Sequence, residues 1–186
     1  MRQGLAAGVR FFQYRGKNAS RRSTYEISAL LARIAGDAGA LFVVNDHADI
    51  AAAAGADGVH LGQDDLPVKY ARNVLGGGKI IGVSTHSIEQ ARAAETAGAD
   101  YIGFGPIFKT STKDAGQTQG VRNLTVIKHA VAIPVIAIGG INEANVQFVA
   151  QAGADGAAVI SAVLAAPDVT FAAEKLFRIW TTVRDQ

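Results

Sequence analysis

AGADYIGFG, residues 97–105, joins a small-residue turn to a short apolar run, and closely similar stretches occur twice more in the chain. They are AGADGVHLG at residues 54–62 and AGADGAAVI at residues 152–160, with a looser version, AAGVRFFQY, at residues 6–14. Each stretch indicates a helix end closed by glycine, a tight turn and a short strand. The strands lack polar alternation, which is typical of parallel strands covered on both faces. The repeat therefore predicts a parallel sheet.

Helical patterns lie between these strands. The spacing of apolar residues and the capping patterns predict helices over Arg21–Ala35, Ser87–Ala97, Asn142–Ala152 and Asp168–Val183. Along the last of these helices we expect the apolar stripe to face the core; its members are Phe171, Leu176, Phe177, Ile179 and Trp180. Seven strands are predicted, at Val9–Tyr14, Leu41–Asn45, Gly58–Leu61, Ile80–Val83, Tyr101–Phe104, Val135–Ile138 and Ala157–Ile160.

Strict alternation of strands and helices predicts an α/β fold with a parallel sheet. A TIM (β/α)8-type barrel needs eight strands and typically ~250 residues, so this chain of 186 residues is about one unit short. The missing unit is at the N-terminal end, where only a partial helix precedes the strand that begins at Val9. We therefore expect one barrel domain over residues 1–186 that lacks its first strand and is unstable, oligomeric or read from an internal start at Met1. An open doubly wound sheet is the alternative, but the regular repeat favours the barrel.

The composition fits a globular protein, with 49% hydrophobic and 18% charged residues. The absence of cysteine excludes disulfides and thiolate zinc sites. No apolar run is long enough for a signal peptide or a membrane span, so the cytoplasm is the default location. No basic tract suggests nucleic acid. A net charge of +2 fits a small anionic substrate, although ordinary surface lysines and arginines explain it equally well.

The carboxyl ends of the predicted strands are polar, and in a parallel barrel the chemistry lies at those ends. In chain order they carry Gln13 to Lys17, Asn45 with Asp46, His60 with residues 62–65, Ser84 to His86, the loop at residues 103–120, Gly139 with Gly140, and Ser161. A single residue of this kind could be a helix cap or a surface group, and His60 is more readily explained as a hydrogen-bonded core histidine. Seven polar ends on one rim indicate a site, in which His60 and His86 have no assigned role.

The residue types narrow the chemistry. The loop GFGPIFKTSTKDAGQTQG, residues 103–120, is rich in hydroxyls and amines, and Arg15 and Lys17 add positive charge. Gly139 and Gly140, placed before a predicted helix, offer backbone N–H groups to a phosphate. Two aspartates from neighbouring strands, Asp46 and Asp65, suit Mg²⁺, which prefers oxygen ligands and substrate phosphate. The rim therefore predicts two phosphorylated small-molecule substrates, at least one held through Mg²⁺. Neither a hydrolase-type catalytic set nor a lysine within a strand is present.

Several stretches resemble the thiamin-phosphate synthase family. They are FFQYRGK, VNDHADIAAAAGADGVHLGQDD, IGVSTHS, GADYIGFGPIFKTSTKDA and IPVIAIGGI. The match runs from about Gly8 to about Ala162. The Thr-x-Thr-Lys loop, the Gly-Gln-x-Asp turn and the Gln-x-Arg-x-Lys strand end are jointly very specific, whereas an isolated Gly-Gly or Asn-Asp is not.

The resemblance implies a TIM barrel that uses Mg²⁺ and joins 4-amino-2-methyl-5-hydroxymethylpyrimidine diphosphate to a thiazole phosphate, giving thiamin phosphate and pyrophosphate. It implies that the pyrimidine diphosphate is bound by Gln13, Arg15, Lys17, Asn45, Ser84 and Lys113. Among these, the catalytic residues would be Arg15, Lys17, Ser84 and Lys113. The implied metal ligands are Asp46 and Asp65. The implied thiazole phosphate site consists of Thr110, Ser111, Thr112, Gly140, Ile160 and Ser161. Between Arg15 and Lys17, the resemblance leads us to expect a residue larger than Gly16. This difference leaves both positive charges in place.

Three other functions compete with this one. A thiazole tautomerase shares the fold, but its loop should lack the Thr-x-Thr-Lys run. A sugar-phosphate epimerase needs a paired acid and base or a histidine-rich metal site, and neither is evident. A phosphate- or thiamin-binding barrel without turnover is the third, and it would bind ligand tightly without forming product.

Overall fold

The computed structural model describes residues 1–110 and 117–184, and its strands and helices alternate along the chain. The strands are β1 (Phe11–Tyr14), β2 (Leu41–Asn45), β3 (Gly58–Leu61), β4 (Ile80–Thr85), β5 (Tyr101–Phe104), β6 (Val135–Ile138) and β7 (Gly156–Ala158). The helices are α1 (Arg2–Ala6), α2 (Arg21–Asp37), α3 (Ala48–Ala53), α4 (Val68–Leu75), α5 (Ile88–Thr96), α6 (Gly120–Ala130), α7 (Val146–Gln151), α8 (Ser161–Leu164) and α9 (Val169–Arg184).

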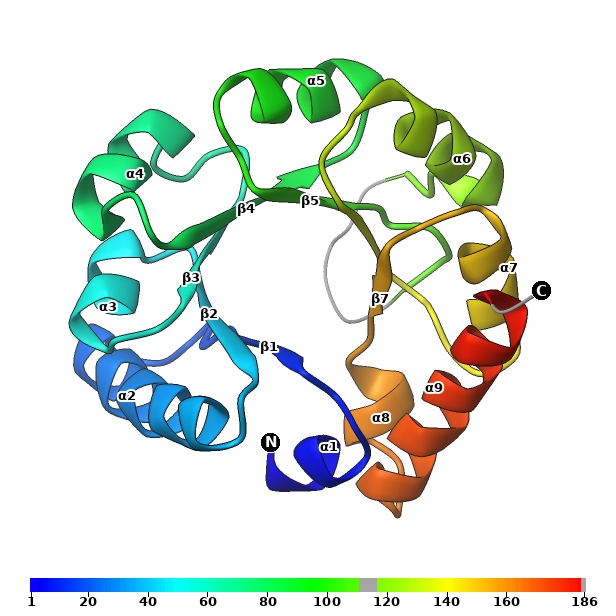
Figure 1. The fold of residues 1–186 in the computed structure, drawn as a ribbon, viewed down its shortest axis with the longest axis horizontal. Helices are drawn as coiled ribbons and strands as arrows, with labels where there is room; N and C mark the ends of the chain where they lie inside the picture. Colours follow the sequence, from blue (N-terminus) through cyan, green and yellow to red (C-terminus); the bar gives the residue numbers. More distant parts are fainter. Residues whose placement is uncertain (111–116, 185–186) are drawn as a thin grey trace.

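All seven strands are parallel and lie side by side in sequence order, from β1 to β7. They curve around a central axis with helices outside them, and the ring is open between β1 and β7 (Figure 1). The predicted seven-stranded barrel without a closing strand is thereby confirmed for the part of the chain that the structure describes. Because every strand runs the same way, all the carboxyl ends gather at one end of the ring.

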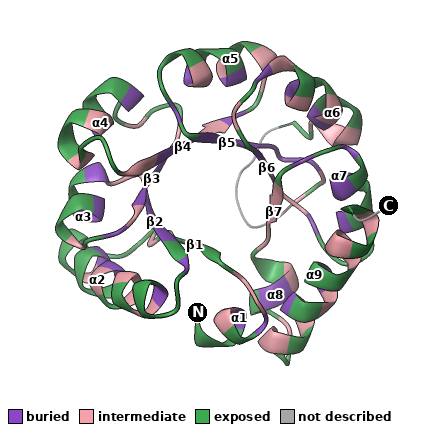
Figure 2. Ribbon diagram, in the orientation of Figure 1, coloured by how far each residue is buried: buried purple, intermediate pink, exposed green. Residues whose placement is uncertain are grey.

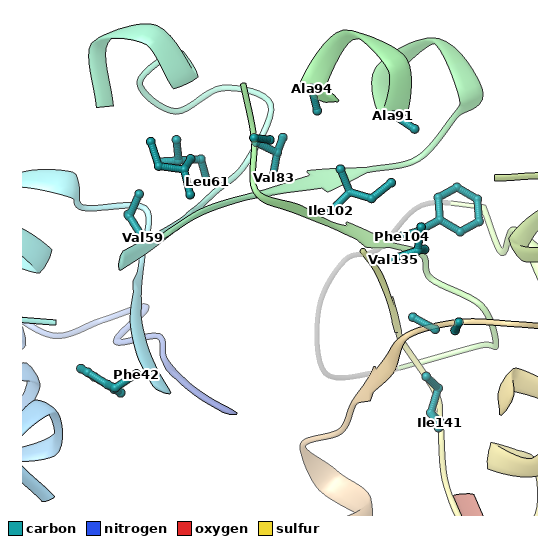
Figure 3. Packing of buried hydrophobic residues seen from close by; sticks show 14 of the residues in the cluster. Phe42, Val59, Leu61, Val83, Ala91, Ala94, Ile102, Phe104, Val135 and Ile141 are labelled. Atoms are coloured by element: carbon teal, nitrogen blue, oxygen red, sulfur yellow. The ribbon is translucent and has the colours of Figure 1, made fainter. Parts of the chain in front are cut away.

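The core lies between the sheet and the surrounding helices. Every second strand residue faces the helices, and Phe42, Val59 and Ile102 in these positions are each 0% exposed. Figure 3 shows such side chains directed at the helices, and in Figure 2 the strands β2 to β5 are mainly buried whereas β1 and β7 are not. The alternate residues point into the ring, where the polar groups of the rim lie.

The aspartate of each repeated turn joins its strand to the strand before it. The Asp57 carboxylate accepts a hydrogen bond from the Phe42 amide at 2.7 Å, and the Asp57 amide donates to the Phe42 carbonyl at 2.8 Å. Asp100 forms the same pair of bonds with Ile81, and Asp155 forms it with Val135. The repeat therefore sets the register of three strand pairs as well as ending three helices.

The bounds of β2, β3, β5 and β6 are as predicted. Helix α7, by contrast, begins at Val146 rather than Asn142. The reason is local, since the Asn142 side chain accepts a hydrogen bond from the Ala144 amide and the Asn145 side chain accepts one from the Asn142 amide. Such side-chain bonds compete with helical ones and form a turn instead.

The predicted apolar stripe of α9 is partly wrong. Leu176 is 8% exposed, and Ile179 and Trp180 pack on the core, but Phe171 and Phe177 are 59% and 52% exposed. The helix packs against α7, α1 and α8, and these two phenylalanines remain exposed. Within the parts of the chain described here, no helix combines the length and the apolar character that crossing a bilayer requires.

Candidate functional site

Asp46 follows β2 in an unusual backbone conformation. It is the one non-glycine residue with a positive φ, 67°, in the described part of the chain. The His47 amide donates to the Asn45 carbonyl at 2.9 Å across it, which makes Asp46 the centre of a γ-turn, and its own amide donates to the His60 carbonyl at 2.8 Å. Strain of this kind is retained mainly where function requires it. The turn directs the Asp46 carboxyl group towards the carboxyl end of β3.

Asp65 lies beyond the end of β3 and meets Asp46. The Asp65 carboxylate accepts a hydrogen bond from the Gly62 amide at 2.6 Å, which fixes it above the strand end. Burial raises the pKa of Asp46, and the hydrogen bond with Asp65 and the negative charge of Asp65 raise it further. Arg15 at the end of β1 and His47 oppose this effect. Two carboxyl groups held together in this way form an arrangement that a divalent cation would stabilise.

These residues fit Mg²⁺ better than a transition metal. Over residues 1–110 and 117–184, no group of three or more His, Cys, Asp or Glu side chains is arranged to bind a metal. A cation at the Asp46–Asp65 pair would therefore need further oxygens from a ligand and from water, which is the usual coordination of Mg²⁺.

Inside the ring, polar side chains from four strands form a connected line. His60 on β3 has its Nδ1 2.9 Å from the Tyr101 hydroxyl and its Nε2 2.9 Å from the Ser84 hydroxyl. Gln13 on β1 hydrogen-bonds the Tyr101 hydroxyl, whose pKa is raised by burial. The Gln63 side chain donates to the Ser84 carbonyl at 2.6 Å. The hydrogen-bonded His60 expected from the sequence is therefore present, and its partners belong to the site.

The loop after β5 packs against the end of β6. The Phe108 amide donates to the Gly139 carbonyl at 3.0 Å, and a side chain at Gly140, where φ is 66°, would collide with Phe108 and with the Lys109 carbonyl. His86 supports the start of this loop, with its Nδ1 2.6 Å from the Gly105 carbonyl. Gly139 and Gly140 lie before a helix, as predicted, but residues 141–145 form a turn between them and the start of α7.

The structure describes some of the remaining predicted site residues but not all of them. Thr110 ends the described part of the β5 loop, whereas Ser111, Thr112 and Lys113 lie outside the described residues. Ile160 is 52% exposed and immediately precedes the short helix α8, which begins at Ser161. Asn45 is 9% exposed at the end of β2. Lys17 is exposed on the loop between β1 and α2.

Tyr101 is the site residue that the sequence analysis missed. It was assigned to an apolar strand, and it is 6% exposed inside the ring. Its ring fits there because Gly82, on the neighbouring strand, has no side chain; any side chain at that position would overlap the ring. The period of two along β5 indicates that Tyr101 and Gly103 share the inward face, but the strand alone does not show which polar groups they meet.

Comparisons with known proteins show the family and the fold of this chain. A family described as thiamine monophosphate synthase matches residues 1–163. The chain is 48% identical to the thiamine-phosphate synthase of Moorella thermoacetica over 99% of this chain and 88% of that protein. It is 50% identical to the thiamine-phosphate synthase of Chloroflexus aurantiacus over 92% of this chain and 80% of that protein. A solved thiamine phosphate pyrophosphorylase from Pyrococcus furiosus superposes with a TM-score of 0.92 at 44% identity, covering 98% of this chain and 88% of that one.

Proposed function

This chain belongs to the thiamine monophosphate synthase family, and from that premise we propose how the rim of its barrel couples a hydroxymethylpyrimidine diphosphate to a thiazole phosphate. The products are thiamin phosphate and pyrophosphate. The observation that carries the proposal is the pair of facing carboxyl groups, Asp46 and Asp65, beside the Arg15 guanidinium. A diphosphate needs a place where negative charge is neutralised, and this part of the rim supplies ligands for a cation and one fixed positive charge.

In this proposal Asp46 and Asp65 hold Mg²⁺. The fit rests on the burial of Asp46 and on its closeness to Asp65, both of which raise the pKa of Asp46. A cation between the two carboxylates would replace the proton that these effects favour. When bound, Mg²⁺ supplies positive charge that stabilises the diphosphate and the departing pyrophosphate.

The pyrimidine diphosphate lies beside β1, β2 and β4. Arg15 and Lys17 pair with its phosphates, and the family resemblance adds Lys113. Gln13, Asn45 and Ser84 are the polar groups of those strand ends, and they orient the ligand. Arg15 is well suited to this task because its planar guanidinium can donate two parallel hydrogen bonds to phosphate oxygens.

The thiazole phosphate lies on the opposite side of the rim. Gly140 packs against the β5 loop that leads to Thr110, Ser111 and Thr112, and Ile160 and Ser161 follow β7 next to it. A barrel often binds phosphate after its last strands, at a short additional helix, and α8 is such a helix.

The reaction then depends on charge and position. The bond between the pyrimidine methylene carbon and the diphosphate oxygen breaks, and its electron pair leaves with pyrophosphate. The resulting cation is stabilised by the pyrimidine, and the thiazole nitrogen supplies the electron pair of the new carbon–nitrogen bond. The chain's residues neutralise the leaving group and hold the nitrogen in line, which are effects that can supply most of a rate enhancement.

Product formation tests the proposal directly. We expect the purified chain, given both substrates and Mg²⁺, to produce thiamin phosphate that is detectable by chromatography, and EDTA to abolish it. Asp65→Asn should lower kcat/KM at least ~100-fold, because it removes one of two charged ligands. The matched control is Asp64→Asn, which changes the adjacent exposed carboxylate and should retain activity. Equal rates for Asp65→Asn and the wild type would exclude the metal site.

A further inference from the structure

Four polar side chains from four strands form one line across the interior of the barrel. Gln13 hydrogen-bonds the Tyr101 hydroxyl, that hydroxyl lies 2.9 Å from His60 Nδ1, and His60 Nε2 lies 2.9 Å from the Ser84 hydroxyl. His60 and Tyr101 are each 6% exposed. Buried polar groups are costly unless they are hydrogen-bonded, so His60 and Tyr101 need the bonds of this line, whose ends are the exposed Gln13 and the half-buried Ser84.

Two glycines make room for the line. A side chain at Gly82 would overlap the Tyr101 ring, and a Cβ at Gly103 would lie 3.1 Å from His60 Cε1. The Phe11 ring packs edge-on against Tyr101 with their centroids 5.4 Å apart. Packing on several sides therefore holds the tyrosine and histidine rings in one arrangement.

With one hydrogen on the His60 ring, the geometry permits two proton orders. In the outward order, the Gln13 amide donates to the Tyr101 oxygen, Tyr101 donates to His60 Nδ1, and His60 Nε2–H donates to Ser84. In the inward order, Ser84 donates to His60 Nε2, His60 Nδ1–H donates to Tyr101, and Tyr101 donates to the Gln13 carbonyl. A hydroxyl group carries one hydrogen, so only the outward order leaves the Ser84 hydrogen for a ligand.

We infer that Tyr101 and His60 are positioning residues that hold the outward proton order and so present the Ser84 hydroxyl as a hydrogen-bond donor to the substrate. This inference rests on the proposed function, because an anionic diphosphate substrate needs donors. A hydrogen bond from Ser84 to a charged oxygen is stronger than one to a neutral group. The bond from Gln63 to the Ser84 carbonyl fixes the backbone that carries this hydroxyl.

The first test is a double-mutant cycle. Tyr101→Phe keeps the ring and removes only the hydroxyl, and we expect kcat/KM for the pyrimidine diphosphate to fall about tenfold with the circular dichroism spectrum unchanged. In a Ser84→Ala background the same change should have no further effect, because both residues act through one hydroxyl. Tyr70→Phe, on an exposed tyrosine of α4, is the matched control. Losses that multiply in the double variant would overturn the inference.

The second test does not depend on activity. The ¹⁵N shifts of the His60 imidazole distinguish its tautomers, and we expect the Nε2–H form in the wild type and a mixture in Tyr101→Phe. An Nδ1–H form in the wild type would overturn the outward order even if the enzyme is active. Absence of thiamin phosphate from the folded wild type would instead overturn the proposed function, and the tautomer measurement would still decide the proton order.

Discussion

At the scale of single residues, Asp46 has a backbone conformation and a side-chain environment that both lower the stability of the folded chain. Asp46 has a positive φ, and its carboxyl group is both partly buried and next to that of Asp65. Each of these features destabilises the charged, metal-free form. The same features prepare the site for a cation, so function and stability oppose each other at this residue.

We therefore expect Asp46→Asn to raise the melting temperature of the metal-free protein at neutral pH. Asparagine tolerates a positive φ and removes the like charge beside Asp65. The variant should at the same time lose the rise in melting temperature that Mg²⁺ gives the wild type. Thermal unfolding with and without Mg²⁺ measures both effects. A lower melting temperature for the metal-free variant would show that the paired carboxyl groups are not destabilising.

At the scale of elements, the repeated aspartates connect each strand to its predecessor. Asp155 illustrates the energetics, because its carboxylate accepts hydrogen bonds from the Val135 amide at 2.8 Å and from the Lys128 ammonium at 2.6 Å. Burial by itself raises the pKa of Asp155, but the bonds from Lys128 and from the Val135 amide outweigh burial and lower it. The folded state therefore favours the ionised form of this carboxyl group.

A lowered pKa in the folded state predicts a definite pH dependence. The stability that Asp155 contributes is present above the ordinary carboxyl pKa of about 4 and is lost as the pH falls through the lower, folded value. Asp155→Asn should lower the free energy of unfolding by about 1 kcal/mol at neutral pH and should show a smaller further loss in acid. Urea unfolding at several pH values measures this, with Asp37→Asn at the exposed end of α2 as the control. Parallel pH curves for the Asp155 variant and the wild type would contradict the assignment.

At the scale of the whole molecule, the open ring divides the sheet into a protected centre and two edges. Strands β2 to β6 each pair with two neighbours, whereas β1 and β7 each pair with one in the part of the chain that the structure describes. Accordingly β2 and β3 are largely buried, while β1 alternates between exposed and half-buried residues. Gln13 and Arg15, two proposed substrate contacts, thus belong to an edge of the sheet.

We expect hydrogen exchange to follow this division. Amides of β3, β4 and β5 should be the slowest to exchange, and those of β1 and β7 should exchange at least about tenfold faster, because edge strands open without breaking the central pairs. Mass spectrometry of peptides that cover each strand measures the rates. Adding Mg²⁺ and pyrophosphate should slow β1 more than β7 if Arg15 binds the ligand. Equal protection of β1 and β4 would contradict an open edge.

The sequence predicted most of the strands because their signals are local. Apolar runs, glycine turns and the aspartate after each turn are read within about ten residues, and β2, β3, β5 and β6 have the predicted bounds. The α7 start was missed because Asn142 and Asn145 bond to their own turn. The exposed Phe171 and Phe177 were missed because a helix stripe shows which residues share a face but not how wide a face its neighbours cover.

The sequence by itself determined the parallel sheet, the order of its strands and the polar rim, since the alternation of strands with helices along the chain and the common strand direction that it implies are sufficient for these. Only the tertiary structure decided that Asp46 meets Asp65 and that Tyr101 reaches both Gln13 and His60. Asp46 and Asp65 come from the ends of neighbouring strands, whereas the contacts of Tyr101 join residues far apart in the chain across the inside of the ring. They depend on the register of several strand pairs and on the space left by Gly82 and Gly103, which no single segment encodes.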